Sequence, residues 1–157
     1  MKPLENISLQ CIYCDDIRDE TNGKTTIVGW YGGEHVQLPL DGPLLLTSLC
    51  MVGLVAMPLT PSDTSFRLDL MQGTDVLQSV NIPPEAVEEM QTNSNGQSIG
   101  KQIRIAIKMA NMTVSEPCIL RLRIVVDKEE IYGNGLRFTR QPVHLNTVVD
   151  ASAEKEL

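Results

Sequence analysis

Four carboxylates lie close together near the start of the chain, and their types and spacing suit cation chemistry. They are Asp15, Asp16, Asp19 and Glu20. Ca²⁺ binds clustered carboxylate oxygens, although this spacing is not that of an EF-hand loop. Asn22-Gly23 supplies the positive-φ residues that a tight strand reversal needs, so the stretch is expected to form a hairpin tip. The cluster therefore predicts either a solvated hairpin tip or a divalent-metal-dependent, calcium-type binding module.

The four cysteines offer a second kind of chemistry. Cys11 and Cys14 form a Cys-x-x-Cys pair, and Cys50 and Cys118 could complete a zinc site with four thiolates. Residues three apart on a strand point to opposite faces, so the first two sulfurs are expected to diverge. We therefore expect buried thiols without metal or cofactor. Free thiols and a polar start to the chain indicate a cytoplasmic protein.

Residues for catalysis are scarce. The two histidines, His35 and His144, stand in no His-Glu-x-x-His pattern, and no serine lies in a nucleophile elbow. We therefore expect a protein that is not an enzyme. The longest apolar stretch, residues 43–58, is shorter than the ~20 residues of a bilayer span, so no membrane association is expected.

Charge is divided unevenly along the chain, whose net charge is −7. Residues 1–100 carry 13 acidic and 4 basic side chains, whereas residues 101–140 carry 4 acidic and 8 basic ones. The acidic total argues against nucleic-acid binding. Alternating basic residues in the later strands predict a basic stripe on one sheet face, either simply solvated or binding an acidic partner or the acidic hairpin of another copy. The stripe comprises Arg104, Arg121, Arg123 and Arg137, with Lys108 and Arg140 nearby.

Trp30 and Tyr31 are adjacent, so on a strand they face opposite sides. Trp30 is expected in the core because a buried indole removes the largest apolar area from water. Tyr31 is then expected at the surface, as a partner contact.

The elements that must position these residues are mostly strands, because polar and apolar residues alternate with a period of two. Turn signals such as Asn22-Gly23 and Gly73 separate the segments. The fold class predicted is all-β: an antiparallel β-sandwich of about eight strands, immunoglobulin-like or C2-like, with one short helix at 83–90. We expect one domain over 1–141 and a flexible acidic tail over 142–157. The expected strands are residues 6–14, 24–31, 44–56, 65–72, 75–82, 99–110, 117–126 and 130–139.

The strand expected at 44–56 lies in a stretch, 44–57, that is apolar on both faces. A sandwich strand normally keeps one wet face, so the second apolar face must be covered. Either the helix and the 32–43 loop cover it, or another subunit does. The leading hypothesis is a non-enzymatic module for protein–protein interaction or assembly, a homo-oligomer or accessory subunit.

Residues 14–31 follow the pattern Cys-Asp-Asp-x-Arg-x-Glu, then Gly-Lys, then an apolar residue and Gly29. This stretch resembles the opening of a group of small bacterial and phage-borne proteins of unknown function. The resemblance covers the N-terminal part of the chain and implies a compact all-β domain in a bacterial or phage setting. It implies no activity and no ligand residue.

Overall fold

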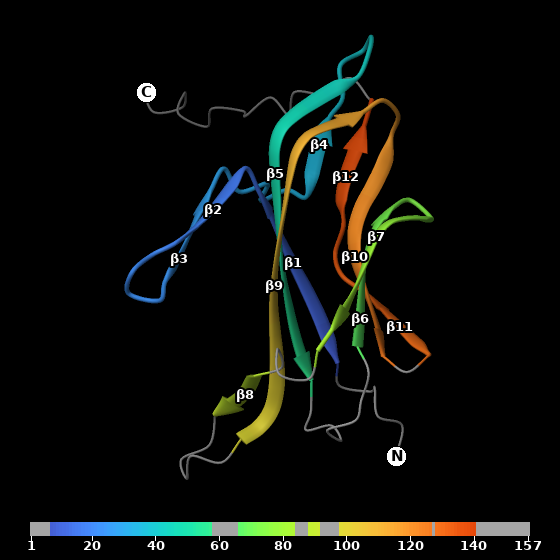
Figure 1. Cartoon of the computed structure of the whole chain (residues 1–157). Helices are drawn as coiled ribbons and strands as arrows, with labels where there is room; N and C mark the ends of the chain where they lie inside the picture. Colours follow the sequence, from blue (N-terminus) through green and yellow to red (C-terminus); the bar gives the residue numbers. More distant parts are fainter. Residues whose placement is uncertain (1–6, 58–65, 84–87, 92–97, 127, 141–157) are drawn as a thin grey trace, which may run out of the picture.

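The computed structural model describes residues 7–57, 66–83, 88–91, 98–126 and 128–140. Within these ranges the chain is all-β, with no helix, and hence with none able to cross a membrane (Figure 1). The strands are β1 (Ser8–Cys14), β2 (Asp16–Asp19), β3 (Thr25–Val28), β4 (His35–Gln37), β5 (Leu44–Met57), β6 (Phe66–Gln72), β7 (Asp75–Ile82), β8 (Glu88–Gln91), β9 (Ser98–Val114), β10 (Cys118–Val126), β11 (Glu129–Tyr132) and β12 (Leu136–Thr139).

The strands form two large sheets and one small one. The first sheet has the order β1-β5-β9-β8 and is antiparallel throughout. The second has the order β4-β12-β10-β6-β7, with β11 also paired to β10, and only β4 with β12 is parallel. The third consists of β2 and β3 alone. We call residues 16–28, which contain these two strands, the arm.

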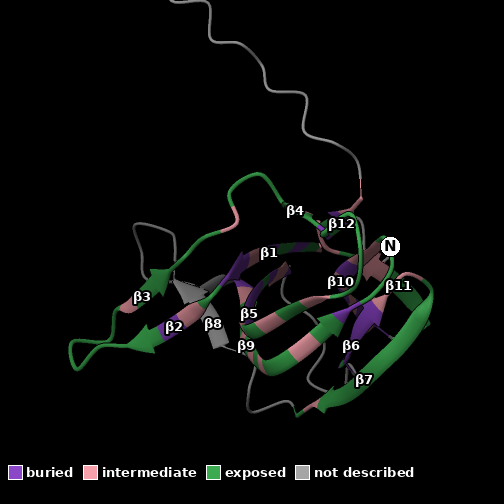
Figure 2. Cartoon of the chain, turned by 90° about the horizontal axis from the view of Figure 1, so that it is seen from above, coloured by how far each residue is buried: buried purple, intermediate pink, exposed green. Residues whose placement is uncertain are grey.

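The two large sheets face each other across one apolar core (Figure 2). Alternate residues of β1 and β5 point inward, among them Leu9, Tyr13 and Met51. They meet inward residues of the second sheet, such as Leu122 and Phe138. This alternation with period two matches the sequence, and it explains why most strand positions were predictable.

The outer face of β5 is the second apolar face noted in the sequence. Its upper part is covered by the chain's own arm: Ile17 of β2 packs with Cys14, Cys50 and Val52 in a separate small cluster. Leu54, further along β5, stays 41% exposed. The cover is therefore neither a helix nor a second subunit at this point, but a hairpin that folds back over the sheet.

The prediction of a short helix at 83–90 is wrong for residues 88–90. Residues 88–91 form β8, with Glu88 opposite Gln102 of β9, so the backbone finds its hydrogen bonds in the sheet ladder. Such pairing overrides a local preference based on Pro and Glu. Residues 84–87 lie outside the described residues, as does the expected acidic tail over 142–157. The domain boundary at 141 stays a prediction, and neither an immunoglobulin-like nor a C2-like type is confirmed.

Candidate functional site

The arm leaves the end of β1 and projects from the outer face of the first sheet (Figure 1). Its turn lies where predicted, but of Asn22 and Gly23 only Gly23 has a positive φ, of 76°; Glu20 N donates to Lys24 O at 2.7 Å. Lys108 on β9 ties the base of the arm down, since Nζ donates to Asp16 Oδ1 at 3.1 Å and to Ile17 O at 2.7 Å. The acidic hairpin is thus a fixed projection rather than a loose loop.

The four carboxylates of the arm region each have a separate partner. Among the described residues no group of three or more potential ligands comes together, so the geometry gives the calcium-type alternative no support. Hydrogen bonds from Lys108 and Arg18 hold the pKa of Asp16 below its usual range. The carboxylates accept from the Tyr31 hydroxyl (Asp15, 2.8 Å), Lys108 and Arg18 (Asp16, 3.1 and 3.3 Å), Thr25 (Asp19, 3.1 Å) and Thr26 (Glu20, 2.8 Å).

Gly29 permits the contact between Asp15 and Tyr31. Its φ is 66°, and a Cβ at this position would lie 2.0 Å from Asp15 Oδ2, so another residue would displace the carboxylate. Burial, followed by the hydrogen bond to Asp15, raises the pKa of Tyr31 to about 12. Tyr31 is half-buried against the main core, so it is not the freely exposed contact that the sequence predicted.

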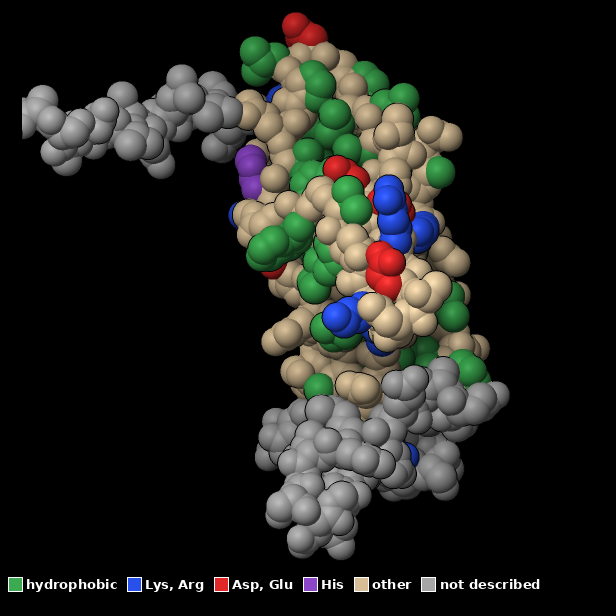
Figure 3. Space-filling model, turned by 90° about the vertical axis from the view of Figure 1, so that its left-hand side faces the viewer, with side chains coloured by type: hydrophobic (Ala, Val, Ile, Leu, Met, Phe, Trp, Pro, Cys, Tyr) green, Lys and Arg blue, Asp and Glu red, His purple; other side chains and the backbone are tan. Residues whose placement is uncertain are grey.

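Trp30 lies at the surface and not in the core, so its predicted position is wrong. It is 68% exposed, whereas its neighbour Tyr31 packs against the main core where the chain returns to β1. On β3 itself Ile27 is 40% and Val28 is 38% exposed. Figure 3 looks at the face that carries the arm, where charged side chains of both signs gather near the centre and hydrophobic ones lie around them.

The cysteines diverge as expected. Cys11 lies in the main core, whereas Cys14 lies in the small cluster on the opposite face of β1, beside Cys50. Burial raises the pKa of both Cys11 and Cys14 to about 11, which keeps them as thiols. All four cysteines are free.

The predicted basic stripe is not one stripe. Arg104 lies on β9 of the first sheet, while Arg121, Arg123 and Arg137 lie on β10 and β12 of the second, because β9 and β10 do not pair. Arg104 Nη1 donates to the hydroxyl of Thr25 on the arm at 3.0 Å. Arg137 is exposed at the edge beside β4, opposite His35.

Asp69 was not among the predicted site residues. It neutralises Arg67 and Arg123 on the outer face of the second sheet. It is fully buried, and Arg123 donates to its Oδ2 from Nη2 at 2.6 Å and from Nε at 3.0 Å. Arg67 bonds both carboxylate oxygens, and Ser79 on β7 donates at 2.6 Å. Burial alone raises the pKa of this carboxyl, but these hydrogen bonds outweigh burial and lower it.

Arg121 and Arg123 also engage β11. The Arg121 guanidinium stacks 4.4 Å from the centroid of the Tyr132 ring, and Arg123 Nη1 donates to Glu130 at 2.8 Å. Hydrogen bonding to Tyr132 and Asp69 raises the pKa of Arg123. Both arginines therefore have partners within the chain. Arg121 and Arg123 do not form a free basic stripe for an acidic ligand on the outer face of the second sheet.

One side edge of the two-sheet body is bridged by hydrogen bonds, beside a hollow of about 420 Å³ whose lining includes Cys11 and Asn134; we call this edge the closed seam. Asn134, in the connection between β11 and β12, bonds the backbone of the edge strand β1. Cys11 N donates to Asn134 Oδ1 at 2.6 Å, and Asn134 Nδ2 donates to Cys11 O at 2.8 Å. Tyr13 OH donates to Asn134 O at 2.6 Å across the sheets. A Cβ on Gly133 would lie 2.6 Å from Cys11 Sγ, so the approach is close.

The opposite side edge is not closed in this way; we call it the open seam. There β9 and β7 face each other, and a cleft of about 340 Å³ lies between them. Over the described residues, β9 beyond Ile103 pairs only with β5, and β7 pairs only with β6. Val80 on the inner face of β7 is 46% exposed. The cleft is lined by Leu68, Leu70, Gln78, Val80, Ile82, Ile105, Ala106, Ile107 and Lys108.

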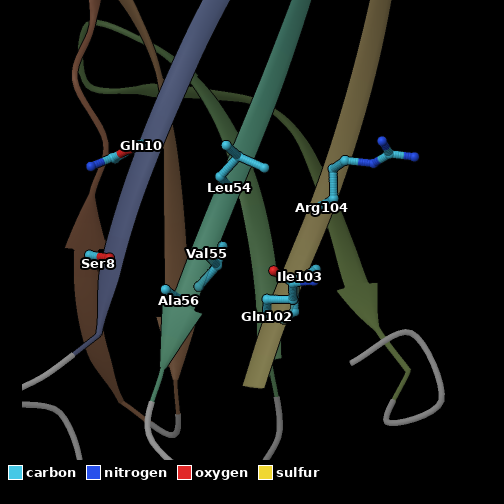
Figure 4. A pocket seen from close by; sticks show the side chains of 8 residues that line it. All are labelled: Ser8, Gln10, Leu54, Val55, Ala56, Gln102, Ile103 and Arg104. Atoms are coloured by element: carbon cyan, nitrogen blue, oxygen red, sulfur yellow. The ribbon is translucent and has the colours of Figure 1, made fainter. Parts of the chain in front are cut away.

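A second hollow lies on the outer face of the first sheet. It has a volume of about 510 Å³ and crosses β1, β5 and β9, with Leu54 at its centre (Figure 4). Its lining mixes amide, hydroxyl and aliphatic groups, with Arg104 at one side. Among its described lining residues, Arg104 is the one with a charged side chain.

Comparison with known proteins gives no relative: no family model, no curated protein and no solved structure matches this chain. The resemblance of residues 14–31 to small bacterial and phage-borne proteins therefore stays a prediction.

Proposed function

We propose that this protein is a non-enzymatic β-sandwich module for self-assembly, and that the open seam is the site at which molecules meet. The observation that carries the proposal is an apolar cleft bordered by two strand edges that have no pairing partner among the described residues. The unpaired length of β9 runs from about Arg104 to Met112, and the exposed inner face of β7 lies across the cleft from it.

Unpaired edges of this kind pair readily with a strand from another molecule, because each presents a row of backbone donors and acceptors. A strand added beside β9 would also cover Val80 and Ile82, which face the cleft. It would remove apolar surface from water and complete the ladder in one step. The lining offers apolar contacts for alternate side chains and only one charged residue, Lys108.

A second copy of the chain suits this site because opposite charges are segregated along the sequence. Residues 1–100 carry a net charge of −9, and residues 101–140 carry +4, so the two parts of neighbouring copies attract. We further propose a reducing cytoplasm as the setting, since the four cysteines are unpaired thiols.

The test is a pair of matched substitutions on β7, Val80→Lys and Val76→Lys. The two valines are 46% and 47% exposed, but only Val80 lines the cleft. Light scattering coupled to size exclusion should give the wild-type protein a solution mass above the chain mass of 17.4 kDa, increasing with concentration. Val80→Lys should return the mass to that of one chain, whereas Val76→Lys should assemble like wild type.

Both variants should keep the β-type circular dichroism spectrum, because both positions are exposed. A wild-type protein that stays a monomer at millimolar concentration contradicts the proposal. So does a Val80→Lys variant that assembles as well as its control.

A further inference from the structure

β3 is the most strand-prone and least protected element of the arm. Its four residues, Thr25 to Val28, are all β-branched, the class that favours extended backbone most strongly. None of them is buried, and in the described chain β3 pairs only with β2. Its partner β2 carries Asp16, Arg18 and Asp19, so charge protects that edge, while β3 has none.

β3 also lies on a projection that other molecules can reach. Figures 1 and 2 show the arm extending from the first sheet, on the side facing away from the second sheet. At its base Trp30 is 68% exposed, and Trp is among the residues that most often dominate protein interfaces. Among the described residues, the same chain therefore has a projecting strand with one free edge and, at another place, a cleft beside a second free edge.

Charge matches the two surfaces. The arm and its flank carry Asp15, Asp16, Asp19 and Glu20 against Arg18 and Lys24. The outward residues of β9 beside the cleft include Arg104 and Lys108, of which Lys108 is already paired with Asp16 of its own arm. Arg104 is bonded to the neutral hydroxyl of Thr25 rather than to a carboxylate, so it can attract an acidic segment of a neighbour.

Pairing of two β9 strands around a two-fold axis fits less well. In an antiparallel pair centred on Ala106, Arg104 of each copy stands opposite Lys108 of the other. Like charges directly opposite each other on a sheet face are destabilising. The uncharged, β-branched strand β3 avoids this repulsion.

We infer that β3 of one copy adds to the free edge of β9 in the next copy, so that the arm fills the open seam of its neighbour. This inference rests on the proposed function and names the segment that occupies the site. The contact joins two different surfaces of the same chain, so it is head-to-tail and leaves an arm free at one end and a seam free at the other. Assembly then continues into a ring or a filament.

The test mixes two variants that are each defective in one surface. Val80→Lys blocks the seam. The double variant Ile27→Lys/Val28→Lys blocks the arm, because adjacent positions place a lysine on both faces of β3, whichever face turns inward. Leu40→Lys/Leu45→Lys is the matched control, since these leucines are 69% and 57% exposed and lie outside both surfaces.

Each defective variant alone should have the mass of one chain by light scattering, and the control should assemble like wild type. An equimolar mixture of the two defective variants should form a dimer of twice the chain mass and nothing larger. Each such dimer joins an intact arm to an intact seam and cannot grow further. Circular dichroism and urea unfolding of each variant check that the fold is kept.

Three results would overturn the inference, and they separate it from the proposed function. If the arm variant assembles like wild type while Val80→Lys does not, the seam is the site but the arm is not its occupant. If both variants are monomers and their mixture stays monomeric, the contact is not arm-to-seam. If Val80→Lys assembles like wild type, the proposed function fails as well.

Discussion

The closed and open seams are the two places where an edge of the first sheet meets the second, and they are built in opposite ways. At the closed seam a side-chain amide, Asn134, satisfies both backbone groups of Cys11, and Tyr13 reaches a carbonyl of the other sheet. At the open seam, Ile105 and Ile107 of β9 are half-buried beside a cleft, and Val80 opposite them is half-exposed.

The two seams show two fates of an edge strand in this chain: the edge of β1 is bonded within the molecule, and the edge of β9 is not bonded by the described residues. At the closed seam, a polar side chain bonds the backbone of the edge strand β1, and Gly133 approaches Cys11 closely. Where no such side chain is supplied, apolar residues and strand edges stay accessible to another chain. The open seam is therefore confined to the residues that line the cleft between β7 and β9, while the rest of the core is closely packed.

The largest expected effect comes from Asp69, which holds β7, the outer wall of the open seam, to β6 and β10. Asp69→Asn leaves the guanidinium of Arg123, only 12% exposed, with the half-exposed carboxylate of Glu130 alone. Removing one member of a buried ion pair destabilises a protein by about 3–5 kcal/mol, and we expect about 3 because Arg67 is 45% exposed. Urea unfolding measures it, with the exposed Asp75→Asn as control; equal stability of the two variants contradicts this role.

The same carboxylate predicts a pH dependence. The folded-state pKa of Asp69 is lowered below its unfolded value of about 3.9, so its contribution is complete above that pH and is lost as the pH falls through the folded pKa. The difference in unfolding free energy between wild type and Asp69→Asn should be constant from pH 5 to 8 and shrink as the pH falls below the unfolded pKa of about 3.9 and through the lowered folded pKa. A difference that persists unchanged in acid would show that the pKa is not lowered.

The closed seam should depend on Asn134. Asn134→Ala leaves the N–H and the carbonyl of Cys11 without their partners in a partly buried position. Each unsatisfied group costs about 1–3 kcal/mol, so a loss of about 2 kcal/mol in unfolding free energy is expected. Asn81→Ala, on the exposed strand β7, should leave stability unchanged. If Asn134→Ala behaves like that control, the amide does not hold the seam closed.

The open seam should tolerate change in the isolated molecule. Val80→Lys should alter the unfolding free energy at low protein concentration by less than about 0.5 kcal/mol, as exposed substitutions usually do. Val76→Lys serves as the comparison by the same thermal or urea measurement. A large destabilisation by Val80→Lys alone would mean that the seam is part of the monomer's core.

Much of the fold could be predicted from the sequence because alternation with period two reports which strand face is buried. The segments around β5, β6, β7 and β10 were expected almost where they lie, and the turn at Gly23 was placed correctly. β2, β4 and β8 were missed as strands, and β11 and β12 were expected as one strand. β4 is short and is defined by its parallel pairing with the distant β12, and β8 by its pairing with β9, rather than by a pattern of its own.

The candidate surfaces were less predictable. Neighbouring arginines in the sequence suggested one stripe, but sheet membership separates Arg104 from Arg121 and Arg123, and Asp69 neutralises part of the second group. Trp30 was misplaced because side-chain size alone did not tell which of two adjacent aromatic residues faces the core, and here Tyr31 does. The open seam depends on which strands lie at sheet edges, and only the three-dimensional pairing reveals that.

Hydrogen exchange of the backbone amides of β9 and β1, followed as the protein concentration rises, tests the central claim most directly. Amides at the free edge of β9, between residues 104 and 112, should exchange quickly in dilute protein and slow markedly as assembly proceeds. The amide of Cys11 at the closed seam should be protected equally at all concentrations. If β9 exchanges at the same rate in monomeric and assembled protein, the open seam is not where these molecules meet.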